Sequence, residues 1–329
     1  MVRVRVKTPS RLHFCLMDLN GELGRVDGSL GVALSQPATI LEVYRGREIK
    51  VHGEVAELVR QLALRFLGHF KIRGGVNIIV RSLIPNHVGL GSTTQLSLAV
   101  AMALARLFGV KETVRGLASV MGRGGTSGVG VATFEGGGLI LDGGHSFGVG
   151  KAKEAFLPSS ASRAPPPPLL LRYRFPEDWR FVVAVPNVAT DFHGDREVQI
   201  FREKCPLPAA EVGKVCRIVL MKVLPALVEG DIEAFGGCLT ELQGVGFPSV
   251  ATEIVKPVVR DCMSFMLSEG AYGVGQSSFG PATYGLVEGD REAERLSSAV
   301  RGFLDREVGG TVFCASANNS GASVRVIRD

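Results

Sequence analysis

The strongest constraint on the fold of this chain is a helix with almost no polar face. Residues 96–108 contain one charged side chain, Arg106, so the helix that they predict must be buried on nearly every side. A strand rich in β-branched residues, 76–83, comes before it, and a glycine-rich loop, 85–95, connects the two. The loop therefore leads from a strand into the N-terminus of a buried helix.

The length of the chain favours two domains. Its 329 residues exceed the roughly 150 residues of a typical single core. The clearest change in composition is the segment 158–168, which ends in four consecutive prolines and is expected to be extended. We predict an N-terminal domain over residues 1–157, a proline-rich linker or loop over 158–168, and a C-terminal domain over 169–329.

The spacing of apolar residues predicts an α+β fold for both domains. A hairpin turn is expected at Asn20-Gly21, because both residues tolerate positive φ. In the first domain we expect strands at 2–7, after Pro9, at 31–34, 39–44 and 76–83, and helices at 54–70 and 111–121. In the second we expect strands at 181–185, 281–287, 311–316 and 322–327, and helices near 209–228, 231–242, 250–268 and 289–305.

Composition and charge exclude several classes of protein. With 46% hydrophobic and 21% charged residues, the chain can build a core, which excludes extensive disorder. No apolar run reaches the ~20 residues of a membrane span, and residues 1–7 do not form a signal peptide, so we expect a cytoplasmic protein. The net charge of +5 comes from scattered basic residues, which favours an anionic small substrate over nucleic acid. The six cysteines stand singly, without metal-ligand spacing, and are interpreted as reduced thiols.

The glycine-rich loop has the chemistry of a phosphate site. Gly89 and Gly91 allow backbone N–H groups to approach a ligand closely, and the helix dipole favours an anion. The hydroxyls of residues 92–94 could cap the helix, or bind phosphate oxygens or a magnesium ion. The loop lacks the Gly-Lys-Ser/Thr ending of a Walker loop, and a glycine-rich turn before a helix can also be turn chemistry alone.

Three motifs together resemble the GHMP kinase superfamily. The loop Pro85-x-x-x-Gly-Leu-Gly-Ser92 is similar to its phosphate-binding motif. Residues 9–13 (PSRLH) resemble its N-terminal motif, and residues 273–284 (GVGQSSFGPATY) resemble its C-terminal glycine-rich motif. The resemblance implies a ribosomal-S5-domain-2-like N-terminal domain, a ferredoxin-like C-terminal domain, and an active site between them.

One departure from the kinases concerns the catalytic base. Many kinases of this superfamily carry a Ser-Gly-x-Asp stretch after the second helix, and its Asp is the base. The matching residues here, 127–130, read Ser-Gly-Val-Gly. A hydroxyl nucleophile would lack its proton acceptor, at a cost of about 10²–10⁴ in rate, so phosphorylation of an alcohol is not favoured.

A closer resemblance is to the β-ribofuranosylaminobenzene 5'-phosphate synthase family. It rests on residues 10–31, 87–96, 122–124 and 276–281. Cys15 and Thr93 differ from the family, which usually has a small residue and often glycine there. The resemblance implies a pentosyltransferase of methanopterin biosynthesis. Such an enzyme joins phosphoribosyl pyrophosphate to 4-aminobenzoate or 4-hydroxybenzoate with loss of carbon dioxide and pyrophosphate, and uses Mg²⁺.

The motifs and their polar residues give a set of expected site residues. We assign catalytic roles to Arg25, Asp27 and His13. We assign substrate or phosphate binding to Arg11, His87, Gly89, Leu90, Gly91, Ser92, Thr93, Thr94, Arg123, Thr126, Ser127, Gln276, Ser277 and Ser278. We assign magnesium binding to Asp18, Ser92 and Asp142.

Several of these residues also have an ordinary structural interpretation. Asp18 and Asp142 stand near glycines and could serve only to form turns. Arg11 and His13 share one face of a strand, which could simply be solvated. The charged segment 193–197 is expected to be an ordinary solvated loop, with a lid over the substrate as the alternative.

Four other functions compete with the synthase hypothesis. A small-molecule kinase would need ATP turnover and a replacement base. A catalytically inactive regulatory protein is disfavoured because polar groups persist in all three motifs. An RNA-binding protein would need basic residues interleaved with aromatics, and an ordinary phosphoribosyltransferase would need an acidic pair after a strand. A homodimer is the expected assembly, because twofold symmetry is commonest.

Overall fold

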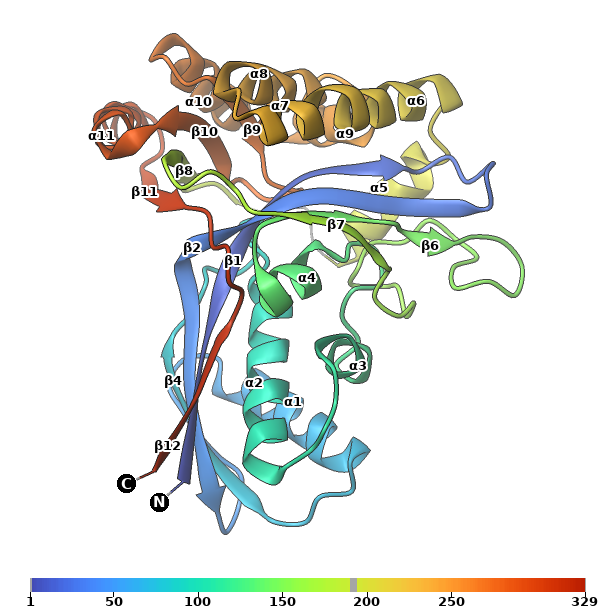
Figure 1. Ribbon diagram of the computed structural model, residues 1–329, viewed down its shortest axis with the longest axis vertical. Coiled ribbons are helices and arrows are strands. Elements are labelled where there is room, and N and C mark those ends of the chain that lie inside the picture. The colour runs from blue at the N-terminus through green and yellow to red at the C-terminus, as the bar shows by residue number, and fades with distance from the viewer. Residues whose placement is uncertain (1, 190–193, 329) are drawn as a thin grey trace.

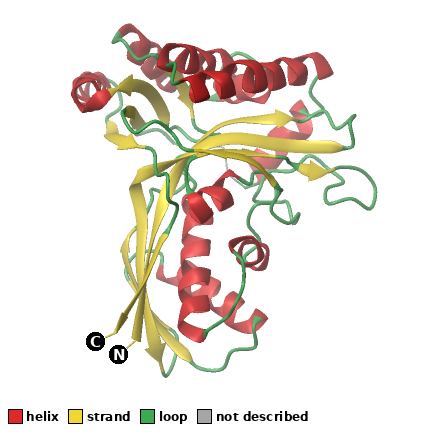
Figure 2. Cartoon of the chain, in the orientation of Figure 1, coloured by secondary structure: helices red, strands yellow, loops and turns green. Residues whose placement is uncertain are grey.

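The computed structural model describes residues 2–189 and 194–328 and contains two β-sheets with helices packed against them (Figure 1). The larger sheet consists of β1 (Val2–Asp18), β2 (Arg25–Gly46), β3 (Lys50–His52), β4 (Gly75–Ser82), β5 (Leu139–Asp142), β6 (His145–Ser146), β7 (Leu169–Tyr173) and β12 (Ser323–Arg328). The smaller sheet is antiparallel, in the order β11 (Gly310–Ser316), β8 (Trp179–Pro186), β10 (Thr283–Glu288) and β9 (Gly273–Gln276). Helices and strands are both abundant in each part (Figure 2), which confirms the predicted α+β class.

Strands β1 and β2 form one long hairpin whose two halves belong to different parts of the molecule. Thr8 pairs with Thr39, and pairing then resumes between Ser10 and Leu34 with a shifted register. Such irregularities bend a strand pair. One half pairs with β4 and β12, and the other extends beneath the helices of the smaller sheet (Figure 1). Two strands predicted separately are therefore the two halves of β2.

Helices α1 (Ala56–His69), α2 (Ser92–Phe108), α3 (Val114–Val120) and α4 (Val129–Gly136) pack beside the larger sheet (Figure 1). Every residue of α2 from 95 to 105 is buried, as its lack of a polar face predicted. Its apolar side chains pack with those of α1, β1 and β2 in one core cluster. The N-terminus of α2 thereby lies close to the bend in the hairpin, where Arg11 donates its backbone N–H to Leu90.

The remaining helices lie on the smaller sheet and on the second half of the hairpin. They are α5 (Asp195–Lys204), α6 (Ala209–Ile218), the π-helical turn η1 (Val219–Val223), α7 (Leu224–Glu229), α8 (Ile232–Leu242), α9 (Gly246–Ile254), α10 (Pro257–Ser268) and α11 (Gly289–Arg306). Phe14 of β1 packs against Phe181 and Tyr284 of the smaller sheet, with ring centroids 6.3 and 5.4 Å away. The two sheets thus share a hydrophobic core on one side of the hairpin.

Several predicted elements are confirmed and others differ for identifiable reasons. The helices expected at 54–70, 111–121, 231–242 and 289–305 are present as α1, α3, α8 and α11, with slightly different ends. The helix expected at 250–268 is two helices, because Pro257 begins a new one. The strand expected at 322–327 is present as β12, but it pairs with β1 in the larger sheet instead of joining the strands of the smaller sheet.

The proline-rich segment 158–168 is a loop packed against the larger sheet. Arg115 donates hydrogen bonds to the carbonyl oxygens of Pro166 and Pro167, and Gly143 donates its N–H to that of Pro168 at 2.8 Å. The proposed domain boundaries on either side of it remain a prediction. Within the described ranges, 2–189 and 194–328, no helix is long and apolar enough to cross a membrane.

Candidate active site

A cavity of about 310 Å³ opens where the three sequence motifs meet. Its walls come from β1, the loop before α2, the start of α4, the 278–280 turn and α5. Twelve of the predicted site residues line it: Arg11, His13, His87, Gly89, Gly91, Ser92, Thr93, Thr94, Arg123, Thr126, Ser127 and Ser278. The structure therefore brings together residues that are up to 267 positions apart in the sequence, from Arg11 to Ser278.

The loop before α2 is built to present backbone N–H groups. His87, Gly89 and Gly91 have φ values of 59°, 95° and 81°, a region that favours glycine. Gly91 caps α2 without any side-chain hydrogen bond, so among the described residues no side chain caps the first N–H groups of the helix. These N–H groups and the hydroxyls of Ser92 and Thr93 surround the cavity and can bind an anion there.

The C-terminal motif holds this loop against β1. The Ser277 hydroxyl donates to the carbonyl oxygen of Gly89 at 2.7 Å and accepts from the N–H of His13 at 2.9 Å. Ala282 donates its N–H to Val88 at 3.1 Å. A Cβ at Gly89 would overlap the carbonyl oxygen of Ser277, so the close approach requires glycine. Ser277 therefore positions the loop, while its neighbour Ser278 faces the cavity.

Two arginines supply positive charge to the cavity. The Arg11 guanidinium donates to the carbonyl oxygen of Gly89, and Arg123 donates through Nε to the Thr94 hydroxyl at 3.1 Å. Burial lowers the pKa of Arg11 to about 10, and the charge of Arg123 adds to this shift. Both side chains are still cationic at neutral pH. They give a polyphosphate the charge that its binding requires.

His13 is held as a neutral imidazole. Burial, followed by repulsion from Arg11, lowers its pKa to about 3 from an ordinary value of 6.5. It lies at a second register shift of the hairpin, between His13 and Cys15, and lines the cavity together with Leu16. At neutral pH it can donate or accept a hydrogen bond, but it carries no charge.

This buried histidine should make the stability of the protein depend on pH. Between about pH 6.5 and 3 the unfolded chain binds a proton that the folded protein rejects, so the free energy of unfolding falls as the pH falls. The contribution is at most about 1.4 kcal/mol per pH unit. His13→Gln should lose less stability than the wild type between pH 7 and 5 in urea unfolding. The exposed His52→Gln is the control, and equal losses in wild type and His13→Gln would contradict the assignment.

Asp27, predicted to be catalytic, lies behind the cavity wall in a buried ion pair. Both of its carboxylate oxygens are 3.0 Å from Nζ of Lys153, and one is 2.6 Å from Nδ1 of His145. The side chains of Asp27 and Lys153 are 0% and 2% exposed. Lys153 also donates to Thr126, a residue of the cavity wall, at 3.3 Å. The geometry gives Asp27 a positioning role, and it does not line the cavity.

The other predicted residues outside the cavity also have structural partners. Arg25 donates to the carbonyl oxygens of Gly143 and Gly144. Asp18 accepts the N–H groups of Asn20 and Gly21 at 2.7 and 3.2 Å, which makes it a turn former. Leu90, Gln276 and Ser277 do not line this cavity, although each lies within two residues of one that does.

The carboxylate of Asp142 accepts hydrogen bonds from three groups of the protein. It accepts hydrogen bonds from the Ser29 hydroxyl, from the N–H of Gly128 at 2.8 Å and from that of Gly144 at 3.0 Å. Burial raises the pKa of Asp142 to about 6, against the effect of these donors. Asp142 ends β5, and its carboxylate binds the N–H groups of Gly128, the N-cap of α4, and of Gly144, in line with the alternative of a turn former.

The three residues assigned to magnesium do not form one site. Ser92 lines the cavity, whereas Asp18 and Asp142 do not. Among the residues that the structure describes, no three His, Cys, Asp or Glu side chains are grouped as a metal would require. The carboxylate in the cavity lining is Glu197 of α5, which accepts a hydrogen bond from Ser160 at 3.1 Å. A metal here would be held mainly by phosphate oxygens, as Mg²⁺ often is.

Two important residues were not predicted from the sequence. Lys153 lies in a glycine- and lysine-containing stretch that reads as an ordinary exposed turn. Glu197 falls in the segment 193–197, predicted to be a solvated loop with a lid over the substrate as the alternative. Residues 195–197 instead begin helix α5 and Glu197 lines the cavity, while His193 lies outside the described residues. The acidic first turn of α5, with Asp195 and Glu197, was the available signal for a helix start.

The comparisons with known proteins support the predicted fold. The profile of the GHMP kinases N terminal domain matches residues 54–138, and that of the GHMP kinases C terminal matches 223–306. The homoserine kinase structure from Cytophaga hutchinsonii has a TM-score of 0.67 at 18% identity and covers 98% of this chain and 97% of that one. Mevalonate diphosphate decarboxylase from Staphylococcus aureus also has a TM-score of 0.67, at 14% identity, over 100% and 99% of the two chains. These structures confirm the predicted fold.

Three much closer relatives have one name in common. The β-ribofuranosylphenol 5'-phosphate synthase of Methanothermobacter thermautotrophicus is 43% identical over 98% of each chain. That of Archaeoglobus fulgidus is 40% identical over 98% of this chain and 100% of its own, and a Methanococcus maripaludis homoserine kinase is 27% identical over 83% and 86%. The chain therefore belongs to the β-ribofuranosylphenol 5'-phosphate synthase family, within the GHMP kinase superfamily.

Proposed function

We propose that this chain joins phosphoribosyl pyrophosphate to 4-hydroxybenzoate, with release of carbon dioxide and pyrophosphate, as a pentosyltransferase of methanopterin biosynthesis. The relatives are named for a ribosylated phenol, which favours the hydroxybenzoate over the aminobenzoate that the sequence left open. A homodimer remains the expected assembly.

The observation that carries the proposal is the residue at position 130. Gly130 lines the cavity beside Thr94, at the position where many kinases of the superfamily have their catalytic Asp. The cavity has a phosphate-binding loop and two arginines, but it lacks the catalytic Asp of the kinases. It therefore suits a reaction in which no hydroxyl nucleophile must lose a proton. Asp142 and Asp27, two carboxylates outside the cavity lining, accept hydrogen bonds from protein donors.

The proposed reaction needs no such proton transfer. The bond between ribose C1 and the pyrophosphate oxygen breaks, and its electron pair leaves with pyrophosphate. The ring carbon that bears the carboxylate forms a bond to C1, with electrons supplied from the 4-hydroxyl. The bond to the carboxylate then breaks, carbon dioxide leaves, and its electron pair restores the aromatic ring.

The residues around the cavity suit the charges that change in this reaction. Negative charge grows on the departing pyrophosphate, where Arg11, Arg123 and the N–H groups at the start of α2 can stabilise it. The Ser92 hydroxyl and the Glu197 carboxylate are the side chains that would hold Mg²⁺ together with the phosphates. Magnesium, when bound, would supply further positive charge to the leaving group.

The proposal predicts the release of two products in equal amounts. Purified protein with phosphoribosyl pyrophosphate, Mg²⁺ and 4-hydroxybenzoate should release carbon dioxide and pyrophosphate at the same rate, which a carbonate-trapping assay and a coupled pyrophosphate assay would measure. ATP with candidate alcohols in place of both substrates is the control. If neither product forms and ATP is consumed in the control, the protein is a small-molecule kinase and the proposal is wrong.

A further inference from the structure

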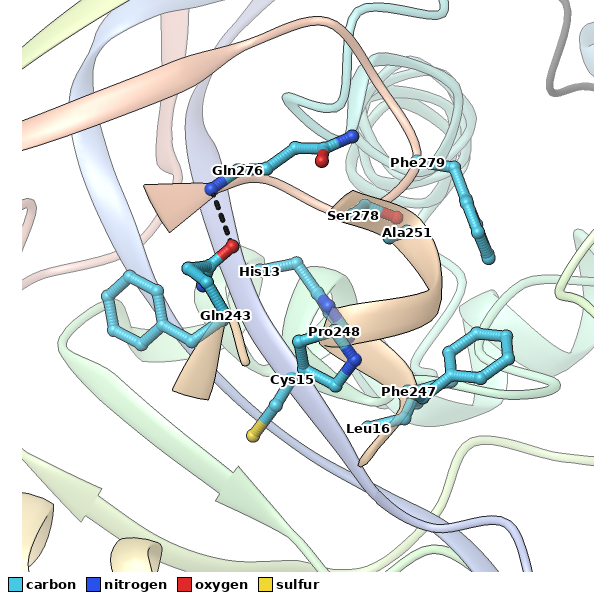
Figure 3. Close-up of a pocket in the computed structure, with 11 residues that line it drawn as sticks. His13, Cys15, Leu16, Gln243, Phe247, Pro248, Ala251, Gln276, Ser278 and Phe279 are labelled. Atoms are coloured by element: carbon cyan, nitrogen blue, oxygen red, sulfur yellow. Dashed lines mark hydrogen bonds between the residues drawn. The ribbon is translucent and has the colours of Figure 1, made fainter. Parts of the chain in front are cut away.

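A second, smaller cavity adjoins the large one and has mostly apolar walls. It has a volume of about 40 Å³ and lies between β1, α9 and the 276–279 segment (Figure 3). Phe14, Phe247, Pro248 and Phe279 are among the side chains that line it. His13, Leu16, Ser278 and Phe279 line both cavities, so the two lie next to each other at these residues.

Gln276, one of the residues that line the small cavity, has a side-chain oxygen without a hydrogen-bond donor among the described residues. Gln276 is 3% exposed, and its Oε1 has no hydrogen-bond partner among the described residues. The orientation of its amide is fixed, because Nε2 donates to the carbonyl oxygen of Gly280 at 3.0 Å. Its backbone N–H donates to Oε1 of Gln243 at 3.0 Å, drawn as a dashed line in Figure 3.

An acceptor in this position is costly unless a ligand satisfies it. A buried polar atom without a partner costs about 1–3 kcal/mol. Among the described residues that line the small cavity, none carries an acidic or a lysine or arginine side chain, and the His13 imidazole is neutral at neutral pH. The cavity therefore suits an aromatic ring edge that carries one neutral hydrogen-bond donor.

We propose that the small cavity receives the 4-substituted edge of the benzoate ring, whose hydroxyl donates a hydrogen bond to Oε1 of Gln276. This inference rests on the proposed function. The carboxyl-bearing carbon stands opposite the hydroxyl on the ring, so it points back past His13 into the large cavity, where the phosphate site lies. Gln276 thereby positions the attacking carbon toward ribose C1 and selects acceptors with a donor at position 4.

The first test compares two ligands of nearly equal shape on the wild-type protein. Isothermal titration, with phosphoribosyl pyrophosphate replaced by pyrophosphate and Mg²⁺ to prevent turnover, gives the dissociation constants of 4-hydroxybenzoate and 4-methylbenzoate. The hydroxyl should improve affinity about tenfold or more, because its absence leaves Gln276 unpaired. Equal affinities would overturn the proposal without any need for a variant.

The second test removes the acceptor. Gln276→Met has a similar length and should raise KM for 4-hydroxybenzoate about tenfold, leave KM for phosphoribosyl pyrophosphate nearly unchanged, and abolish the preference over 4-methylbenzoate in titration. Tyr284→Phe is the matched control, because Tyr284 Oη is another buried atom without a partner in the described chain but lines neither cavity.

The outcomes separate this inference from the function on which it rests. A wild-type protein that releases no carbon dioxide from 4-hydroxybenzoate would refute the proposed function. A wild-type protein that is active, together with a Gln276→Met variant that keeps the hydroxyl preference or raises both KM values equally, would refute only the role of Gln276.

Discussion

Replacing Arg11 with glutamine should lower kcat/KM with phosphoribosyl pyrophosphate by about 10²–10³-fold, the loss typical of removing one donor to a developing negative charge. Arg11 lines the large cavity and its guanidinium is fixed by the carbonyl oxygen of Gly89. Its charge is therefore in place before the pyrophosphate leaves. Steady-state kinetics with each substrate varied in turn would measure the effect.

Two further variants make the Arg11 result interpretable. Arg60→Gln removes an exposed arginine whose guanidinium is 3.9 Å from Glu57, and it should leave kcat/KM unchanged. Arg11→Lys keeps the charge but not the planar fork, so its loss should be intermediate. Wild-type kinetics in a folded Arg11→Gln protein would show that the phosphates bind elsewhere.

Replacing Asp27 with asparagine should lower the free energy of unfolding by about 3 kcal/mol, because it leaves Lys153 as a buried charge without its carboxylate. Asparagine tolerates the positive φ of 68° at this position, so the backbone adds little to the cost. Urea unfolding at neutral pH would measure the change.

The partner of Asp27 offers a direct control for this prediction. In the double variant Asp27→Asn/Lys153→Met no buried charge remains, so most of the lost stability should return. Asp18→Asn, in the same hairpin but in a partly exposed turn, should cost about 1 kcal/mol or less. A double variant less stable than Asp27→Asn would show that Lys153 is held by its other bonds, to Thr126 and the carbonyl oxygen of Leu157.

The parts of the fold and of the site that depend on residues close together in the sequence could be predicted from it. The phosphate loop and helix α2 follow from glycine positions and from an uninterrupted apolar pattern, both of which act locally. The role of Asp27 could not be predicted, since its partner Lys153 is 126 residues further along the chain. The unpaired oxygen of Gln276 depends on three-dimensional packing in the same way.

The bend of the β1–β2 hairpin also could not be predicted from the sequence. The residues that separate its halves on β2, 35–38, contain a proline and polar residues that usually end strands, so two short strands were predicted there. Ala38 accepts a hydrogen bond from Ser82 at the end of β4, and Ser35 and Gln36 bond to Ser316 and Cys314 of β11. The backbone therefore stays extended through this region. Tertiary contacts override the local signal.

The pairing of β12 with β1 has a consequence for the way this chain folds during synthesis. Residues 323–328 complete an edge of the larger sheet, yet the ribosome makes them after every strand of the smaller sheet. The outer edge of β1 therefore stays open throughout the synthesis of the intervening 300 or so residues, as an unpaired template for another strand. The first sheet to begin is the last to be finished, so the nascent chain depends on the rest of its own sequence, or on a chaperone, to shield that edge.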